Sequence, residues 1–174
     1  MSIKQNLRLL SALLFMSVAF NASAGFDDGL AAAKRGDFKT ALSELKPLAD
    51  QGDALAQDLL GVMYENGGGV AQDYGQAVAW YRKAADQGDA DAQSNLGVMY
   101  ANSRGVARNY IVAYALYNLS ASIDSSDKNN ATNNRNSLVK HMTPAQVEAG
   151  QALTRKMSTR GNLLKALDRY LAHR

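Results

Sequence analysis

The stretch GVMYENGGGVAQDY, residues 61–74, recurs thirty-six residues later as GVMYANSRGVARNY, residues 97–110. The same offset aligns ADQGDA at residues 49–54 with ADQGDA at residues 85–90. So many identities at one offset indicate an internal repeat, and a period of this length is typical of solenoids and related repeat architectures. The sequence therefore predicts a stack of similar structural units.

Apolar side chains within each copy follow the period of an α-helix. Ala92, Leu96 and Tyr100 are spaced at i, i+4 and i+8, which places them on one face of a helix. A second helix is predicted from about Asp73 to Gln87, after the glycine-containing turn. Each copy is therefore interpreted as a pair of helices.

A less regular unit precedes these two copies. Gly29 lies only 32 residues before Gly61, because the turn Arg35-Gly36-Asp37 is shorter and has no run of glycines. With this unit included, three helix pairs are predicted over residues 25–123.

The glycine run at residues 67–69 raises the alternative of a phosphate-binding loop. Gly67 and Gly68 become Ser103 and Arg104 in the next copy, whereas Gly69 recurs as Gly105. No Lys-Ser or Lys-Thr pair follows the run, as a P-loop would require. The pattern favours a turn, for which glycine supplies the backbone freedom.

The first 24 residues have the order of a secretory signal. Lys4 and Arg8 precede an apolar run from Leu9 to Phe20, and the small residues Ala22-Ser23-Ala24 follow. The run is too short to span a bilayer as a helix. We expect residues 1–24 to direct export and then to be removed. The alternative is a helix that packs within the domain.

Composition excludes some classes of function. The chain has no cysteine, so thiol nucleophiles and thiolate metal sites are excluded. The formal charge of +3 falls to +1 without Lys4 and Arg8, and this small charge gives no argument for nucleic-acid binding. Residues 25–154 carry 11 basic and 15 acidic side chains, whereas residues 155–174 carry six basic side chains against one acidic. The body and the tail therefore have opposite charge.

The second unit resembles the Sel-one-like repeat family, a variant of the tetratricopeptide helical repeat. The matching residues are Ala56, Leu60-Gly61, Tyr64, Gly67 to Val70, Asp73, Ala77, Trp80-Tyr81 and Ala84-Ala85. The third unit departs from the pattern at Ser103, Asn109 and Leu116. The resemblance covers about residues 30–121.

The resemblance implies an all-α, right-handed solenoid whose concave face binds a protein or peptide. Residues of the first helices that are not needed for packing would line this face, namely Asp58, Val62, Glu65, Asp91, Ser94 and Val98. Family members with enzymatic claims are cysteine-rich, so the resemblance implies neither activity nor a cofactor here. With the export signal, the family's frequent bacterial occurrence points to the periplasm, and secretion is the alternative.

A helical extension is predicted over residues 124–158. The asparagine-rich segment at residues 125–136 is read as a loop or a weak helix, with a short helix from about Ala131 to His141. Thr143-Pro144-Ala145-Gln146 has the order of a capping box with proline at the first helical position. The helix that it begins is expected to end near Met157.

The tail, residues 159–174, forms a basic amphipathic pattern. Its apolar stripe at helical spacing consists of Leu163, Leu164, Leu167, Tyr170 and Leu171. One interpretation is a helix docked on the end of the array. A second is contact with an anionic membrane or an acidic partner, and a third is disorder.

Candidate catalytic residues are few. His141 and His173 are the only histidines, and their separation matches no metal-binding motif. Ser137 lies four residues before His141, so a helix would place both on one face and permit a nucleophile–base pair. A hydrolase of the cell envelope is therefore kept as the alternative to a non-catalytic scaffold.

Overall fold

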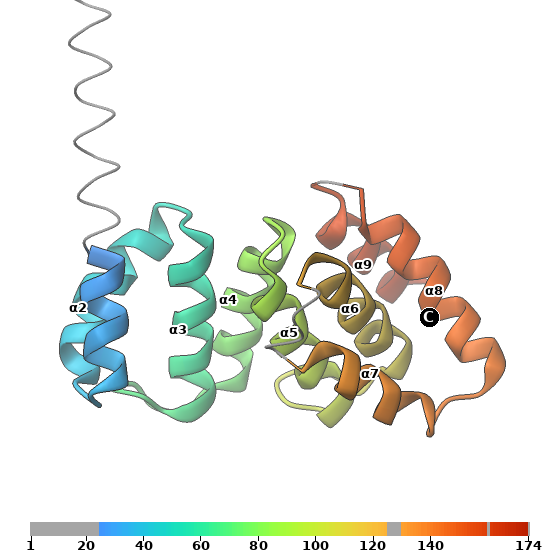
Figure 1. Ribbon diagram of the computed structural model, residues 1–174, viewed down its shortest axis with the longest axis horizontal. Coiled ribbons are helices and arrows are strands. Elements are labelled where there is room, and N and C mark those ends of the chain that lie inside the picture. The colour runs from blue at the N-terminus through green and yellow to red at the C-terminus, as the bar shows by residue number, and fades with distance from the viewer. Residues whose placement is uncertain (1–24, 125–129, 160, 174) are drawn as a thin grey trace, which may run out of the picture.

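The computed structural model describes residues 25–124, 130–159 and 161–173, and these residues form helices and turns without strands. Figure 1 shows the helices stacked along the long axis of the molecule. The predicted signal segment and part of the asparagine-rich segment lie outside the described residues. The prediction of an all-helical solenoid is confirmed.

The helices up to residue 123 follow one another in pairs. The first pair joins a helix at residues 25–34 to α2 (Phe38–Asp50), the second joins α3 (Ala54–Asn66) to α4 (Tyr74–Asp86), and the third joins α5 (Ala90–Asn102) to α6 (Tyr110–Ile123). Each helix from α2 to α6 packs against the next one in the sequence. The three predicted helix pairs are therefore confirmed.

A short polar side chain begins each helix from α2 to α6. The carboxylate of Asp53 accepts a hydrogen bond from the N–H of Ala56, and Asp89 does the same for Ala92 one repeat later. The equivalent residues in the other three helices are Asp37, Asp73 and Asn109. These bonds satisfy N–H groups that have no partner within the helix, so the capping residues set where each helix begins.

The recurring turn glycine lies against the preceding helix pair. Gly69 and Gly105 both have positive φ, at 72° and 69°. A Cβ added at Gly69 would lie 2.7 Å from the Cβ of Phe38, and one at Gly105 would lie 2.4 Å from the carbonyl oxygen of Tyr74. Phe38 and Tyr74 occupy the same position at the start of α2 and α4. The glycines therefore permit both the turn and its close packing.

Glycines inside the first helices allow a second close contact. A Cβ added at Gly61 would lie 2.5 Å from the ring of Tyr81, and one at Gly97 would lie 2.7 Å from the ring of Tyr117. Each ring belongs to the second helix of the same pair, and both rings are buried. Glycine and tyrosine at these two repeat positions therefore hold the helices of a pair together.

Three further helices complete the described chain: α7 (Ala131–Val139), α8 (Pro144–Met157) and α9 (Leu163–Ala172). The hydroxyl of Thr143 accepts from the N–H of Gln146, whose side chain accepts from the N–H of Thr143. This capping box confirms the predicted start of α8. Helices α7 and α8 both pack on α6.

Helix α9 packs on α8 and also reaches back to α4 of the second pair. Leu163 and Leu167 are buried, and Leu164, Tyr170 and Leu171 pack partly buried against the same core. Arg82 of α4 forms an ion pair with Asp168 of α9. The docked interpretation of the tail is supported, because its apolar stripe is used within the fold.

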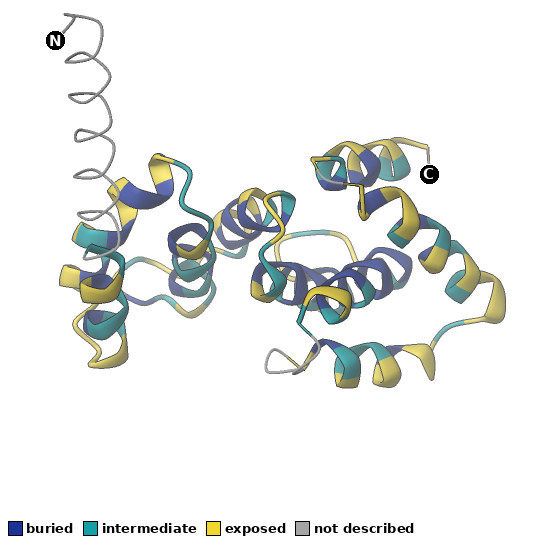
Figure 2. Cartoon of the chain, turned by 45° about the horizontal axis from the view of Figure 1, so that its top comes forward, coloured by how far each residue is buried: buried dark blue, intermediate teal, exposed yellow. Residues whose placement is uncertain are grey.

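Buried side chains form two clusters that meet within α4. The N-terminal cluster contains side chains of the first three helices together with Trp80. The larger cluster contains Tyr81 and extends through α5 and α6 to α8 and α9. Figure 2 shows buried residues on the helix faces turned toward neighbouring helices and exposed residues on the outer faces. Adjacent residues of one helix thus belong to different parts of the core.

Candidate partner-binding face

The predicted binding residues lie on α3 and α5, the first helices of the second and third pairs. Asp91 is exposed at the start of α5, whereas Val62 and Val98 are half-buried. The amide of Asn95 on α5 donates a hydrogen bond of 3.0 Å to the carboxylate of Asp58 on α3. This bond shows that the two first helices lie side by side, as a common face requires.

Ser94 does not contribute to this face, because its exposed fraction is only 1%. It occupies the same repeat position as Asp58, which is thirty-six residues earlier. The contact between Asp58 and Asn95 shows that this position is directed along the array toward the following pair. The prediction that Ser94 lines an open surface is therefore corrected.

Glu65 is held by two partners within the array. Its carboxylate accepts a hydrogen bond of 2.8 Å from the hydroxyl of Tyr81 and one of 3.0 Å from the guanidinium of Arg104. Burial raises the pKa of Tyr81, and the negative charge of Glu65 raises it further. The Tyr81 hydroxyl therefore remains a donor, and Glu65 joins α3 to α4 and to the turn after α5.

Asp58 titrates close to neutral pH. Burial, followed by the negative charge of Asp89, raises the pKa of this carboxyl to about 7, although the hydrogen bond from Asn95 opposes the change. The charges of Asp91 and Glu65 act in the same direction as that of Asp89. Carboxylates are thus close enough on α3 and α5 to influence one another, and this part of the face is acidic.

Sequence reasoning missed an apolar hollow beside this acidic area. A cavity of about 340 Å³ lies between the helix at residues 25–34 and α3, and Phe38 at the start of α2 also lines it. Phe38 is 39% exposed there, a large fraction for an apolar side chain. The lining residues are Leu30, Ala33, Lys34, Phe38, Leu59, Val62, Met63, Asn66, Gly67 and Gly68. The signal for this hollow in the sequence was the helical spacing of Leu59, Val62 and Asn66.

Ser137 and His141 do not form a catalytic arrangement. Ser137 is near the end of α7 and His141 is in the turn that follows, and both residues are exposed. Within the described ranges, neither side chain has a hydrogen bond or an ion pair to a carboxylate. Groups of His, Asp or Glu that could hold a metal ion are also absent from the described part of the chain.

Comparison with known families agrees with this architecture. The model of the Sel1 repeat matches residues 54–89 and 90–125, which are two successive copies. Residues 54–125 therefore form two Sel1 repeats. Sel1 repeat proteins generally mediate protein–protein interactions. No match was found among curated proteins.

Solved structures of Sel1 repeat proteins share this fold. A protective antigen of uropathogenic Escherichia coli strains with an SLR fold superposes with a TM-score of 0.72 at 29% identity, over 88% of this chain and 33% of the other. A Sel1 repeat protein from Oxalobacter formigenes gives a TM-score of 0.53 at 34% identity, over 59% of this chain and 39% of the other. This chain therefore spans between a third and two fifths of the length of these proteins.

The two Sel1 repeats carry the acidic part of the face, whereas the apolar hollow begins in the helix pair before them. That pair has the same capping aspartate at residue 37 and the same close glycine contact, here between Gly29 and Leu45.

No helix within the described ranges has the length and apolar content needed to cross a membrane.

Proposed function

We propose that this protein is an exported, non-catalytic scaffold that binds a protein or peptide on the face formed by the first helices. The observation that carries the proposal is the apolar hollow at Val62, which adjoins the acidic area around Asp58 and Asp91. Apolar clefts bordered by a few polar groups are typical binding sites. Export rests on the signal-like order of residues 1–24.

The chemistry of the face favours one type of partner segment. Leu59, Val62 and Phe38 can surround an apolar side chain. Asp91 is exposed and can attract a lysine or arginine a few residues away on the partner. Complementary charge increases the association rate and selects the orientation of the bound segment. The expected ligand is therefore a segment with an apolar anchor and basic neighbours.

The structure also indicates which substitutions test the face. Asp58 and Glu65 are bonded within the array, so charge reversal there would disturb the fold as well as the surface. Val62→Glu places a charge in the hollow, and Asp91→Lys reverses an exposed charge. Val139→Glu and Glu148→Lys are matched controls, because both residues are exposed on other helices.

The experiment begins with crosslinking in the native organism and identification of the bound protein. Binding of that protein to each variant is then measured by calorimetry. Val62→Glu and Asp91→Lys should each weaken binding by about tenfold or more, because they affect a buried anchor and a complementary charge. The controls should bind normally. Equal affinity across all four variants would exclude this face as the binding site.

Export has a separate test. When the complete sequence is expressed, the extracytoplasmic fraction should contain a shorter form of the protein whose sequence begins near Gly25. Replacing Leu13 and Leu14 with aspartate should retain it in the cytoplasm, because the apolar segment of an export signal is then interrupted. Retention of the full-length form in the cytoplasm of wild-type cells would contradict export.

A further inference from the structure

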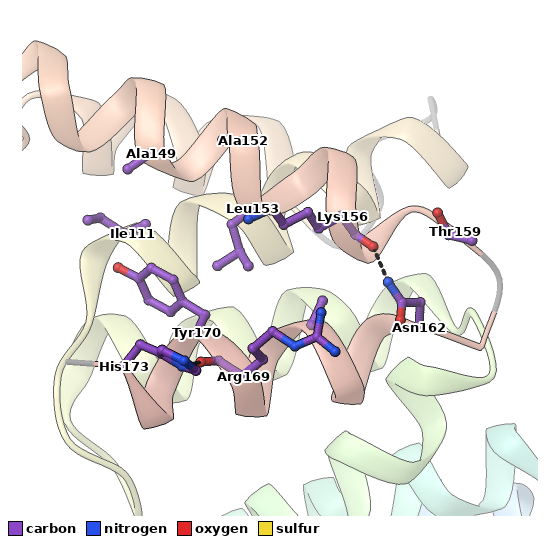
Figure 3. A pocket seen from close by; sticks show the side chains of 11 residues that line it. Ile111, Ala149, Ala152, Leu153, Lys156, Thr159, Asn162, Arg169, Tyr170 and His173 are labelled. Atoms are coloured by element: carbon purple, nitrogen blue, oxygen red, sulfur yellow. Dashed lines mark hydrogen bonds between the residues drawn. The ribbon is translucent and has the colours of Figure 1, made fainter.

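A cavity of about 870 Å³ lies between α8 and α9, and Ile111 of α6 forms part of its wall (Figure 3). It is separate from the partner-binding face, which is formed by α3 and α5. Its lining residues are Ile111, Ala149, Ala152, Leu153, Lys156, Thr159, Asn162, Ala166, Arg169, Tyr170 and His173. This set includes basic and apolar side chains but no carboxylate.

Small residues line the cavity on both helices. Ala149 and Ala152 of α8 and Ala166 of α9 line it, whereas Leu153 and Ile111 supply larger apolar surfaces. Facing helices in proteins are ordinarily packed without large voids. A space of this volume is within the range of small-molecule sites. The alanines therefore leave room for an apolar group.

One polar contact joins the end of α8 to the start of α9 beside this space. The amide of Asn162 donates a hydrogen bond of 2.7 Å to the carbonyl oxygen of Lys156, at the end of α8. At the other end of α9, a ring nitrogen of His173 lies 2.7 Å from the carbonyl oxygen of Arg169. The first contact fixes where α9 begins relative to α8, and the second lies within the C-terminal end of α9.

The charged groups in the cavity are all basic. Lys156 and Arg169 make no ion pair within the part of the chain that the structure describes. Figure 3 shows both side chains running along the space between α8 and α9. Positive groups beside an apolar wall attract a ligand with an anionic head and an apolar arm.

We propose that this cavity binds a carboxylate carried on a hydrocarbon chain, as in a medium-chain fatty acid. The carboxylate pairs with Lys156 and Arg169, and the chain lies against Ala149, Ala152 and Leu153. A peptide fits less well, because the lining helices already use their backbone groups internally and would leave peptide amides without partners. A hydrocarbon chain needs no such partners.

Calorimetric titration of the intact protein tests the proposal with dodecanoate below its micellar concentration. Saturable binding with one ligand per chain is expected. Dodecanol has the same hydrocarbon chain without the charge, and its affinity should be lower by about tenfold or more. Dodecyltrimethylammonium, which carries a positive charge, should not bind. An acidic peptide, the alternative ligand, should bind more weakly than dodecanoate in the same titration. Failure of dodecanoate to bind, or equal affinity for dodecanol, would overturn the proposal.

Two pairs of substitutions distinguish the cavity from general charge attraction. Lys156→Gln with Arg169→Gln removes the charges that line the cavity and should weaken dodecanoate binding by about tenfold or more. Arg155→Gln with Lys165→Gln removes the same charge from exposed neighbours on the same helices, outside the lining. This control should bind dodecanoate normally. Equal weakening by both pairs would contradict the assigned site.

A third variant tests the apolar part. Ala152→Phe fills the cavity and should abolish dodecanoate binding, provided that circular dichroism shows an unchanged helix content. Unchanged affinity in a folded Ala152→Phe protein would place the ligand elsewhere. Because these residues lie on α8 and α9, the result does not depend on the proposed partner-binding face.

Discussion

The backbone N–H of Leu164 donates a hydrogen bond of 3.0 Å to the carboxylate of Asp86, although the two residues are 78 positions apart. Leu164 is in the first turn of α9, where backbone N–H groups lack partners within the helix. The side chain of the local capping residue, Asn162, makes no capping bond to this turn and instead donates to the carbonyl oxygen of Lys156. Asp86 on α4 therefore caps a helix that belongs to a distant part of the sequence.

Asp86→Ala should loosen the tail. Loss of a capping carboxylate costs about 1 kcal/mol, and here the bond also anchors α9 to α4. We expect faster tryptic cleavage in the tail and a lower unfolding midpoint in urea. Asp50→Ala is the control, because Asp50 occupies the same repeat position but pairs only with the exposed Lys46. Equal effects of the two substitutions would contradict the capping role.

Gly105→Ala should destabilise the protein more than Gly36→Ala does. Both glycines have positive φ, which costs another residue about 1 kcal/mol. A Cβ at Gly36 meets no atom within 4 Å, whereas one at Gly105 would lie 2.4 Å from the carbonyl oxygen of Tyr74. We therefore expect a loss of about 3 kcal/mol for Gly105→Ala in urea unfolding. Similar losses would show that turn conformation alone requires Gly105.

Ser103→Gly should stabilise the third pair. Ser103 ends α5 with a φ of 59°, where Gly67 stands in the preceding repeat. Relief of this conformation should raise the free energy of unfolding by about 0.5 kcal/mol, after the entropy of glycine in the unfolded chain is included. Ala101→Gly, inside the helix, should lower it by about 1 kcal/mol. Thermal unfolding of both variants shows whether each substitution raises or lowers the free energy of unfolding.

Asp58→Asn should change how stability depends on pH. The pKa of Asp58 is raised to about 7 in the folded protein, compared with about 3.9 in an unfolded chain. The folded state therefore holds this proton more tightly, and the resulting stability is full below about pH 4 and is lost as pH rises through about 7. The variant lacks this loss, so its stability relative to the wild type should increase from pH 4 to pH 8.

Urea unfolding at both pH values measures this difference. The hydrogen bond from Asn95 can persist in Asp58→Asn, because an amide oxygen also accepts. Asp28→Asn serves as the control, because it removes an exposed carboxylate from the helix at residues 25–34 that is not among the charges acting on Asp58, so the loss of stability near pH 7 should persist. A profile of Asp58→Asn parallel to that of the wild type would rule out proton binding by this carboxyl in the folded state.

The helix pairs could be predicted because their signals are local and repeated. Asp53 and Asp89 bond to N–H groups three residues away, and Thr143 and Gln146 complete a capping box over the same distance. Such contacts depend on adjacent sequence alone. The offset of thirty-six residues then extended the assignment from one copy to the next.

The path of α9 could not be predicted in the same way. Asp50 and Asp86 occupy equivalent repeat positions, yet one pairs with Lys46 and the other caps α9. Ser94 and Asp58 are also equivalent, but Ser94 is buried because of what surrounds it in three dimensions. The two cavities depend on the distances between packed helices, which the spacing of side chains along a single helix does not give. The position of a residue in the repeat identifies the side of the helix on which its side chain lies, but not the residues that it contacts.

The division of the core between Trp80 and Tyr81 has a consequence for how the array opens. The tail ties α4, α8 and α9 into one cooperative block, whereas the N-terminal pair shares only the smaller cluster. Unfolding fluctuations should therefore begin at the N-terminal end, and amide hydrogen exchange should be fastest there. Because the hollow at Val62 lies in this less protected segment, a ligand bound there would suppress its opening and stabilise the array from that end.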